Sequence, residues 1–187
     1  MTKTALLIVD LQNDYFPGGK WELEGTEAVA ANAAKLLGCF REKKWPVVHV
    51  RHEFPTEDAP FFAPDSPGAE IHSSVKNRDG EPVVVKHQIN SFRETNLQEH
   101  LREWGVERVL ICGAMSHMCI DAVTRAAKDL GYQCAVAHDA CATRELEFEG
   151  MTVPATQVHA AFMAALGFAY AEVDSTEQWL QGFLQPS

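Results

Sequence analysis

The chain has 187 residues, 46% of them hydrophobic, and a formal net charge of −10 at pH 7. This length suits a single domain over residues 1–187 that buries about 70% of the surface of the unfolded chain. The acidic balance, with no basic stripe in the sequence, argues against nucleic-acid and anionic-membrane partners. No apolar run approaches the length of a membrane span and no signal-peptide pattern is present, so we expect a cytoplasmic protein.

Strand-like and helix-like patterns alternate along the chain. Apolar runs predict strands at 4–10, 46–51, 82–86, 107–112, 133–138 and 169–173. Helical spacing predicts helices at 26–43 (Thr26 as N-cap), 96–104, 120–130, 155–166 and 175–184, the last opened by a capping box from Ser175 to Gln178. Segments 52–81 and 139–153 are expected to be irregular, the first as a pocket wall, a partner contact, or both. The alternation predicts an α/β fold, a three-layer α/β/α sandwich around a mainly parallel sheet of about six strands.

Three polar side chains stand where apolar strand patterns end. Asp10 and Lys86 each close a strand, and Cys119 follows another strand at the point where a helix is expected to begin. The carboxyl ends of parallel strands form the rim where open α/β folds bind ligands, so the three side chains can converge there. A thiol at a helix N-terminus is expected to have a lowered pKa and to react as the thiolate. Taken singly, each residue also has a structural interpretation, as a turn aspartate, a solvated lysine or a packed cysteine.

The segments around these residues, at 8–16, 85–92 and 113–121, resemble the signatures of the isochorismatase-like cysteine hydrolases. That family includes nicotinamidase, N-carbamoylsarcosine amidase and streptothricin hydrolase, and the resemblance covers nearly the whole chain. It implies an α/β/α sandwich, a catalytic triad of Asp10, Lys86 and Cys119, and assembly into a homodimer or larger homo-oligomer. It also implies a cis peptide bond before Met115.

A cysteine hydrolase of this kind is expected to cleave a C–N bond of a small molecule, in an amide, carbamoyl compound or lactam, through a thioester. Asp10 acts as general base and then acid, while Lys86 holds Asp10 and lowers the pKa of Cys119. Backbone N–H groups of Met115 and Cys119 are the candidate oxyanion donors. One alternative is an isochorismatase-type vinyl-ether hydrolase, in which Asp10 is an acid and no thiol is needed. Another is a non-catalytic member of the family.

Substrate contacts are expected from residues that follow the strand ends. The candidates are Tyr15, Phe16, Trp21, Asn90, Ser91, Phe92, His117 and Thr143. Arg144 can bind a carboxylate or pair with one of the neighbouring glutamates, whereas His138 and His159 are interpreted as structural.

No metal and no cofactor are expected. Nicotinamidases carry an Asp-x-His pair after the second strand, where this chain has His52 and Phe54. His49, His52, Glu53 and His72 could gather around an ion, but such scattered side chains are more often hydrogen-bonded or on the surface.

The five cysteines show no metal-finger spacing, so we expect free thiols in a reducing compartment. The helix pattern around 158–166 is apolar on more than one face, which is consistent with an interface between copies of the chain.

Overall fold

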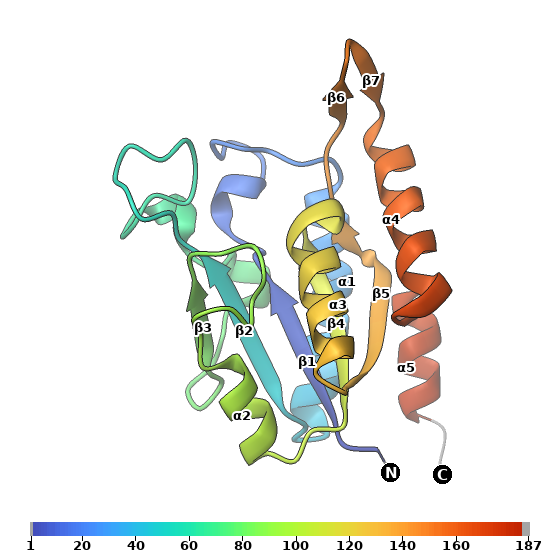
Figure 1. The fold of residues 1–187 in the computed structure, drawn as a ribbon. Coiled ribbons are helices and arrows are strands. Elements are labelled where there is room, and N and C mark those ends of the chain that lie inside the picture. Colours follow the sequence, from blue (N-terminus) through green and yellow to red (C-terminus); the bar gives the residue numbers. More distant parts are fainter. Residues whose placement is uncertain (1, 185–187) are drawn as a thin grey trace.

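The computed structural model describes residues 2–184 and is built around one six-stranded sheet (Figure 1). The strand order is β3-β2-β1-β4-β5-β8, and every neighbouring pair is parallel. The strands are β1 (Thr4–Val9), β2 (Val47–His52), β3 (Val83–Lys86), β4 (Arg108–Ala114), β5 (Gln133–Ala142) and β8 (Glu172–Asp174). The predicted α/β class and the number of strands are confirmed.

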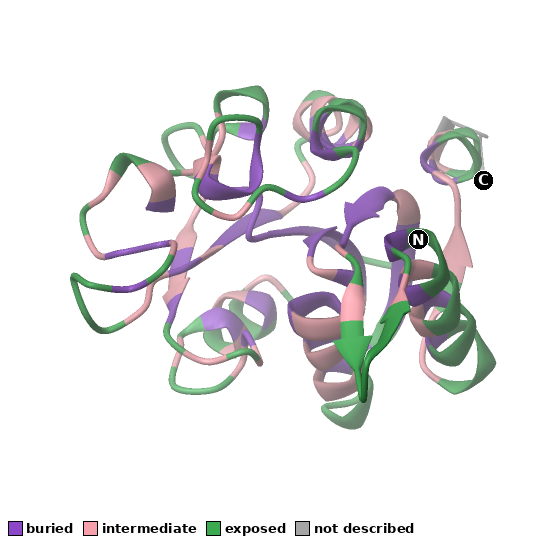
Figure 2. Cartoon of the chain, turned by 90° about the horizontal axis from the view of Figure 1, so that it is seen from above, coloured by how far each residue is buried: buried purple, intermediate pink, exposed green. Residues whose placement is uncertain are grey.

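Helices cover both faces of this sheet (Figure 2). They are α1 (Thr26–Glu42), α2 (Leu97–Glu103), α3 (Asp121–Asp129), α4 (Ala155–Ala169) and α5 (Thr176–Leu184). Successive side chains of a strand point to opposite faces. Leu6 and Ile8 of β1 therefore pack with α1 and α5, whereas Leu7 and Val9 pack with α2, α3 and α4. The result is the three-layer sandwich that strands buried on both faces require.

The direction in which the sheet is built reverses between β1 and β4. The chain adds β2 and β3 on one side of β1 and then returns to add β4, β5 and β8 on the other. Open α/β sheets bind ligands at the carboxyl ends of the strands beside such a switch point. Asp10 directly follows β1 and Cys119 lies in the turn after β4, so both lie at this crevice.

Several expected boundaries were wrong. The helix after β4 begins with a π-helical turn, Ser116–Ile120, so Cys119 lies inside the first turn instead of just before the helix. Thr26 is the first residue of α1 and not its cap, because Gly25 occupies the cap position with a left-handed φ of 68°. Strand β5 continues well beyond residue 138, to Ala142, since its end pairs with the end of β4 across a register shift. Local spacing does not reveal such pairing.

The segment 139–153 is not irregular throughout, as the sequence suggested. It contains an antiparallel hairpin of β6 (Leu146–Phe148) and β7 (Met151–Val153), which projects from the body of the molecule (Figure 1). Each strand has three residues, too few for an alternating pattern to be recognised.

Three other expectations are confirmed. The capping box forms, because Ser175 N donates to Gln178 Oε1 and Gln178 N donates to Ser175 Oγ. The segment 52–81 is irregular apart from an isolated bridge at Ile71 and short 3-10 turns at Pro67–Ala69 and Ser73–Val75. All five cysteines are free thiols.

Among residues 2–184, no helix combines the length and the hydropathy needed to cross a membrane.

Candidate active site

The structure brings Asp10, Lys86 and Cys119 together although they come from the ends of three strands. Lys86 Nζ lies 2.8 Å from Asp10 Oδ2 and 3.2 Å from Cys119 Sγ. All three side chains are buried, and those of Asp10 and Lys86 are almost fully excluded from solvent. An ammonium group thus bridges a carboxylate and a thiol in a site that water scarcely reaches.

His52 is a third partner of Lys86, and the sequence did not identify this role. It ends β2 and is paired in register with Lys86 at the end of β3. Lys86 Nζ lies 3.0 Å from His52 Nδ1. A lysine ammonium has three donors, and here three acceptors lie within reach of them. Burial, followed by the positive charge of Lys86, lowers the pKa of His52 to about 4, so the imidazole is neutral and accepts from the ammonium.

A buried glutamine that the sequence analysis did not single out ties the strand ends together. Gln12 Oε1 accepts from His52 N at 2.8 Å, and Gln12 Nε2 donates to the carbonyl oxygens of His52 and Ala69 at 2.8 and 2.7 Å. Asp10, two residues earlier, has a left-handed φ of 52°. Non-glycine residues seldom adopt this conformation and do so mostly where the surrounding structure enforces it. Gln12 therefore joins the chain that follows Asp10 to the strand that carries His52.

The Cys119 thiol differs from its expected state. Burial is the main cause that raises its pKa, and the negative charge of Asp10 raises it further, while Lys86 lowers it. The net effect is a raised pKa of Cys119, and the expectation that the sulfur is a thiolate at rest is wrong. The helix terminus and one ammonium do not outweigh desolvation beside a carboxylate. The sulfur is therefore a neutral thiol at rest and must lose its proton during the reaction.

The backbone around Met115 carries the N–H groups that are expected as oxyanion donors, those of Met115 and Cys119. The Ala114–Met115 peptide bond is cis, and the Met115 N–H donates to no acceptor within residues 2–184. The Met115 carbonyl accepts from Met118 N and Ile120 N at 3.0 and 3.2 Å, which closes the turn beneath Cys119. Cys119 lies in the first turn of this helix, where backbone N–H groups lack intrahelical acceptors.

An aromatic wall leads away from the three buried residues. The Tyr15 ring packs 4.5 Å from Phe62, and Trp21 stacks 4.8 Å from Phe61. The Arg144 guanidinium lies over Trp21, 4.5 Å from the ring centroid. Burial raises the pKa of Tyr15, and the negative charge of Asp10 acts in the same direction while the positive charge of Arg144 opposes it. Tyr15 is thus close to both the buried cluster and Arg144.

His117 and Thr143 form one hydrogen-bonded pair. His117 Nδ1 lies 2.6 Å from Thr143 Oγ1, across the gap between the turn after β4 and the end of β5. Burial lowers the pKa of His117, and the positive charge of Arg144 lowers it further. The pair is therefore next to Arg144 and contains a neutral imidazole.

Three of the candidate substrate residues, Phe16, Phe92 and Asn90, contact other residues of the protein. Phe16 stacks on His72 with ring centroids 3.6 Å apart, and Phe92 packs on the Tyr132 ring in the core beneath α2 and α3. Asn90 Oδ1 accepts from Phe92 N within its own turn, and neither Asn90 nor Ser91 hydrogen-bonds to Asp10. The Ser91 hydroxyl is buried and has no hydrogen-bond partner, so a substrate contact by Ser91 stays a prediction.

The histidines considered for a metal lie in separate environments. His49 pairs with Glu81 at 3.0 Å, His52 accepts from Lys86, and His72 contacts Ser74 and Phe16. Within the described part of the chain, no three His, Cys, Asp or Glu side chains are grouped so that they could hold a metal ion.

Comparisons with known proteins identify the family of this chain. The isochorismatase domain family matches residues 4–170. The isochorismatase family protein YddQ of Bacillus subtilis is 52% identical over 178 residues, which are 95% of this chain and 99% of YddQ. Streptothricin hydrolase of Streptomyces noursei is 34% identical over 167 residues, 87% of this chain and 65% of that protein. A crystal structure assigned to the isochorismatase hydrolases, from Oleispira antarctica, has a TM-score of 0.94 and 61% identity over 97% of both chains.

Proposed function

This chain belongs to the isochorismatase family of hydrolases, and we propose that it cleaves a C–N bond of a small amide, carbamoyl compound or lactam. The observation that carries the proposal is the position of Lys86 Nζ, between the Asp10 carboxylate and the Cys119 sulfur. A vinyl-ether hydrolase needs an acid but no nucleophile, so a buried thiol in this position favours the amidase. The similarity to streptothricin hydrolase supports the same choice.

The reaction proposed for the site starts from the neutral thiol. Asp10 accepts the proton of Cys119 as the sulfur attacks the carbonyl carbon, and Lys86 stabilises the emerging thiolate. The oxyanion of the tetrahedral intermediate accepts hydrogen bonds from the N–H groups of Met115 and Cys119. Asp10 then returns the proton to the nitrogen, which leaves as ammonia or an amine. Water attacks the thioester with Asp10 as base, the carboxylic acid is released and the thiol is restored.

Arg144 indicates which amides fit best. It forms no ion pair with a carboxylate in residues 2–184, although three glutamates follow within five residues. Instead it lies over Trp21, whose Nε1–H is buried without an acceptor. An unpaired guanidinium beside an unused indole donor suits a carboxylate. We therefore propose an amide that carries a carboxylate, with Tyr15, His117 and Thr143 lining the space between.

The proposed function is tested with a panel of carboxylated and neutral amides, assayed for ammonia or amine release. Wild-type protein is compared with Cys119→Ala and with Cys39→Ala, which removes a half-exposed thiol on α1. We expect activity in wild type and Cys39→Ala, none in Cys119→Ala, and conversion of the thioester to a hydroxamate by hydroxylamine. Full amidase activity in Cys119→Ala would refute the thioester route. Vinyl-ether hydrolysis that survives in Cys119→Ala, without amide turnover, would establish the alternative function.

We also propose that the protein is a homo-oligomer built through α4. This helix buries Val158, Met163 and Leu166 but leaves an apolar outer face. That face consists of Ala160, Ala161, Ala164, Ala165 and Phe168. The Phe168 side chain, at the last turn of α4, is 92% exposed, and Phe148 and Met151, in the hairpin before the first turn, are 67% and 62% exposed. Apolar surface of this kind is typical of a protein interface, and a second copy of the chain is the occupant we propose.

A further inference from the structure

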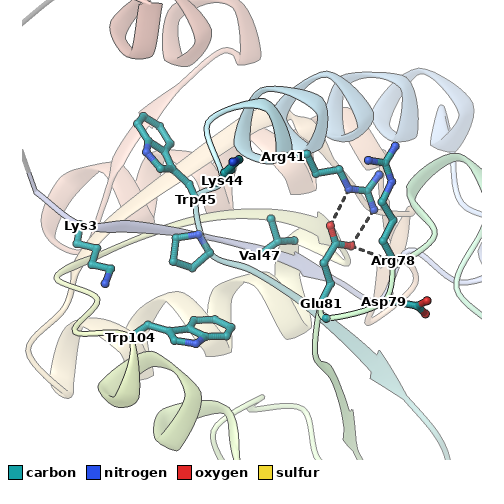
Figure 3. A pocket seen from close by; sticks show the side chains of 11 residues that line it. Lys3, Arg41, Lys44, Trp45, Val47, Arg78, Asp79, Glu81 and Trp104 are labelled. Carbon is teal, nitrogen blue, oxygen red and sulfur yellow. Dashed lines mark hydrogen bonds and ion pairs between the residues drawn. The ribbon is translucent and has the colours of Figure 1, made fainter.

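Two hollows lie at opposite ends of the strands. The larger, of about 580 Å³, is formed where β1, β2 and β3 begin. Its Lys3, Lys44 and Arg78 side chains lie on different sides and point away from one another, so one ligand does not engage the three together (Figure 3). The smaller, of about 220 Å³, lies where β5 ends, and its lining includes Thr143 and His159. His159 of α4 is therefore next to the wall of the Cys119 site.

Ser116 joins the turn that holds Cys119 to two other segments. It opens the π-helical turn after β4 and is fully buried. Its hydroxyl oxygen lies 3.2 Å from the carbonyl oxygen of Ala142, at the end of β5, and 2.8 Å from Nδ1 of His159. One hydroxyl thus connects the turn after β4, the end of β5 and α4, which come from three separate parts of the chain.

The protons in these two contacts follow from what each group can donate. A hydroxyl has one proton and can also accept, whereas a carbonyl oxygen only accepts. Ser116 therefore donates to Ala142, and its oxygen accepts from His159, whose Nδ1 carries a proton. Burial, followed by the positive charge of His138, lowers the pKa of His159, so the imidazole is neutral. Its tautomer is then the one with the proton on Nδ1 and none on Nε2.

A second contact holds the same turn against α4. The rings of His117 and Phe162 pack edge to face, with centroids 6.0 Å apart. His117 also bonds to Thr143, the residue after Ala142. Two successive residues of the turn, Ser116 and His117, are thus fixed by α4 on one side and by the end of β5 on the other.

The position of this turn matters for the proposed reaction. Met115, whose N–H is an expected oxyanion donor, directly precedes Ser116, and Cys119 follows three residues later. Donors to an oxyanion must be in place before the charge develops, and the loss of one typically lowers the rate about 10²–10³-fold. A displacement of Ser116 would move the Met115 N–H relative to the sulfur.

We propose that His159 is a positioning residue for the reaction at Cys119. Its Nδ1–H holds the hydroxyl of Ser116, and the hydroxyl holds the turn that carries the Met115 N–H and the sulfur. His159 acts through Ser116 alone. This role rests on the proposed function and goes beyond the structural part expected for His159 from the sequence.

Substitutions at residue 159 separate the hydrogen bond from the packing. An asparagine amide can present an N–H near the place of Nδ1, whereas a glutamine amide reaches the place of Nε2. We expect His159→Gln to lower kcat at least about tenfold with KM changed by less than about twofold, and His159→Asn to retain most of kcat. The assay is amine or ammonia release from the best amide of the panel. A role in packing alone would lower the stability of both variants in urea and would not separate their kcat values.

His138→Gln is the matched control. The His138 ring lies 6.5 Å from that of His159, but the Ser116 hydroxyl bonds to Ala142 and His159 instead. This variant should keep the kcat of wild type. Ser116→Ala removes both hydrogen bonds and should lower kcat at least as far as His159→Gln. Adding His159→Gln to Ser116→Ala should lower kcat no further, because the shared contact is already lost.

The tautomer of His159 can be measured without a substrate. In a nitrogen NMR spectrum of protein with labelled histidine, at neutral pH, the signals of His159 are those that disappear in His159→Asn. They should show the proton on Nδ1. Absence of amide turnover in wild type would reject the proposed function, whereas a proton on Nε2 would reject the hydrogen bond, so the two failures are distinguishable.

Other results would also overturn the proposal. One is the kcat of wild type in His159→Gln. Another is an equal loss of kcat in His159→Asn and His159→Gln, or in His138→Gln and His159→Gln. A further one is a change confined to KM, which would place His159 in substrate binding. Additive losses from Ser116→Ala and His159→Gln would show that the two residues act separately.

Discussion

His52 and Lys86 end neighbouring parallel strands, and Nζ of Lys86 lies 3.0 Å from Nδ1 of His52. The lysine thus has a neutral acceptor in addition to the Asp10 carboxylate and the Cys119 sulfur. This arrangement fixes the ammonium between the two groups that must exchange a proton. It also makes the protonation of His52 costly, because a charged imidazole would face a buried ammonium.

The stability of the protein should therefore depend on His52 at mildly acidic pH. The pKa of His52 is lowered from an ordinary value of 6.5 to about 4 in the folded state. Between these values the unfolded chain binds the proton more readily, so stability falls as pH falls from 6.5 toward 4. We expect His52 to contribute up to about 3 kcal/mol to this loss. Urea unfolding across this range should show a shallower pH dependence in His52→Gln.

His100→Gln is the control for this measurement, since His100 lies on α2 and its charge is not among those that shift the pKa of His52. Its pH dependence should match that of wild type. If the free energy of unfolding of His52→Gln depends on pH as steeply as that of wild type, His52 does not titrate as the structure indicates.

Asp10 and Lys86 should move the pKa of Cys119 in opposite directions. The charge of Asp10 raises that pKa and the charge of Lys86 lowers it. In Asp10→Asn the pH midpoint of iodoacetamide labelling at Cys119 should fall, although turnover is lost with the base. In Lys86→Met the midpoint should rise. Peptide mass spectrometry reads both, with Cys39 in the same protein as an internal standard. Shifts in the same direction would contradict this electrostatic account.

Gly113 should be required for the approach of β4 to β1. Its φ is 129°, and a Cβ there would overlap the Val9 carbonyl oxygen. Gly113→Ala should lower the free energy of unfolding by at least about 2 kcal/mol. Gly38→Ala is the matched control, because Gly38 lies in α1 with no atom within 4 Å of the added carbon. It should stabilise the protein by about 0.5–1 kcal/mol, as alanine favours helix. Urea unfolding measures both variants, and an equal change in the free energy of unfolding for Gly113→Ala and Gly38→Ala would reject the steric argument.

Phe168 should decide the assembly of the protein. A single chain has a mass of 20.7 kDa, and sedimentation of wild type should give at least twice that mass at micromolar concentration. Phe168→Glu places a charge on the outer face of α4 and should release monomers. Leu130→Glu changes another exposed apolar residue, at the end of α3, and should leave the assembly intact. A monomeric wild type would defeat the proposal.

Much of the fold followed from the sequence because the relevant signals are local. Apolar runs such as 5–9 and helical spacing such as that in 26–42 predicted most elements to within a few residues. The hairpin at 146–153 and the extension of β5 were missed, since both depend on pairing between segments. Of the site, Asp10, Lys86 and Cys119 were found from their position at strand ends, whereas Gln12 and the role of His52 were not. A polar residue whose role is to link distant segments leaves no local sequence pattern by which that role could be recognised.

The sequence by itself determined the order of strands and helices along the chain, the class of the fold and the identity of three polar side chains at strand ends. These are properties of short segments, and periodicity and strand ends report them directly. Only the tertiary structure decided that the Cys119 thiol is neutral, because burial beside Asp10 outweighs Lys86. Only the tertiary structure brought His52 and Gln12 together at the strand ends beside Lys86. The effects of neighbouring charges and of burial on a pKa depend on the distances between groups in space. Those distances are set by the packing of segments that are far apart in the chain.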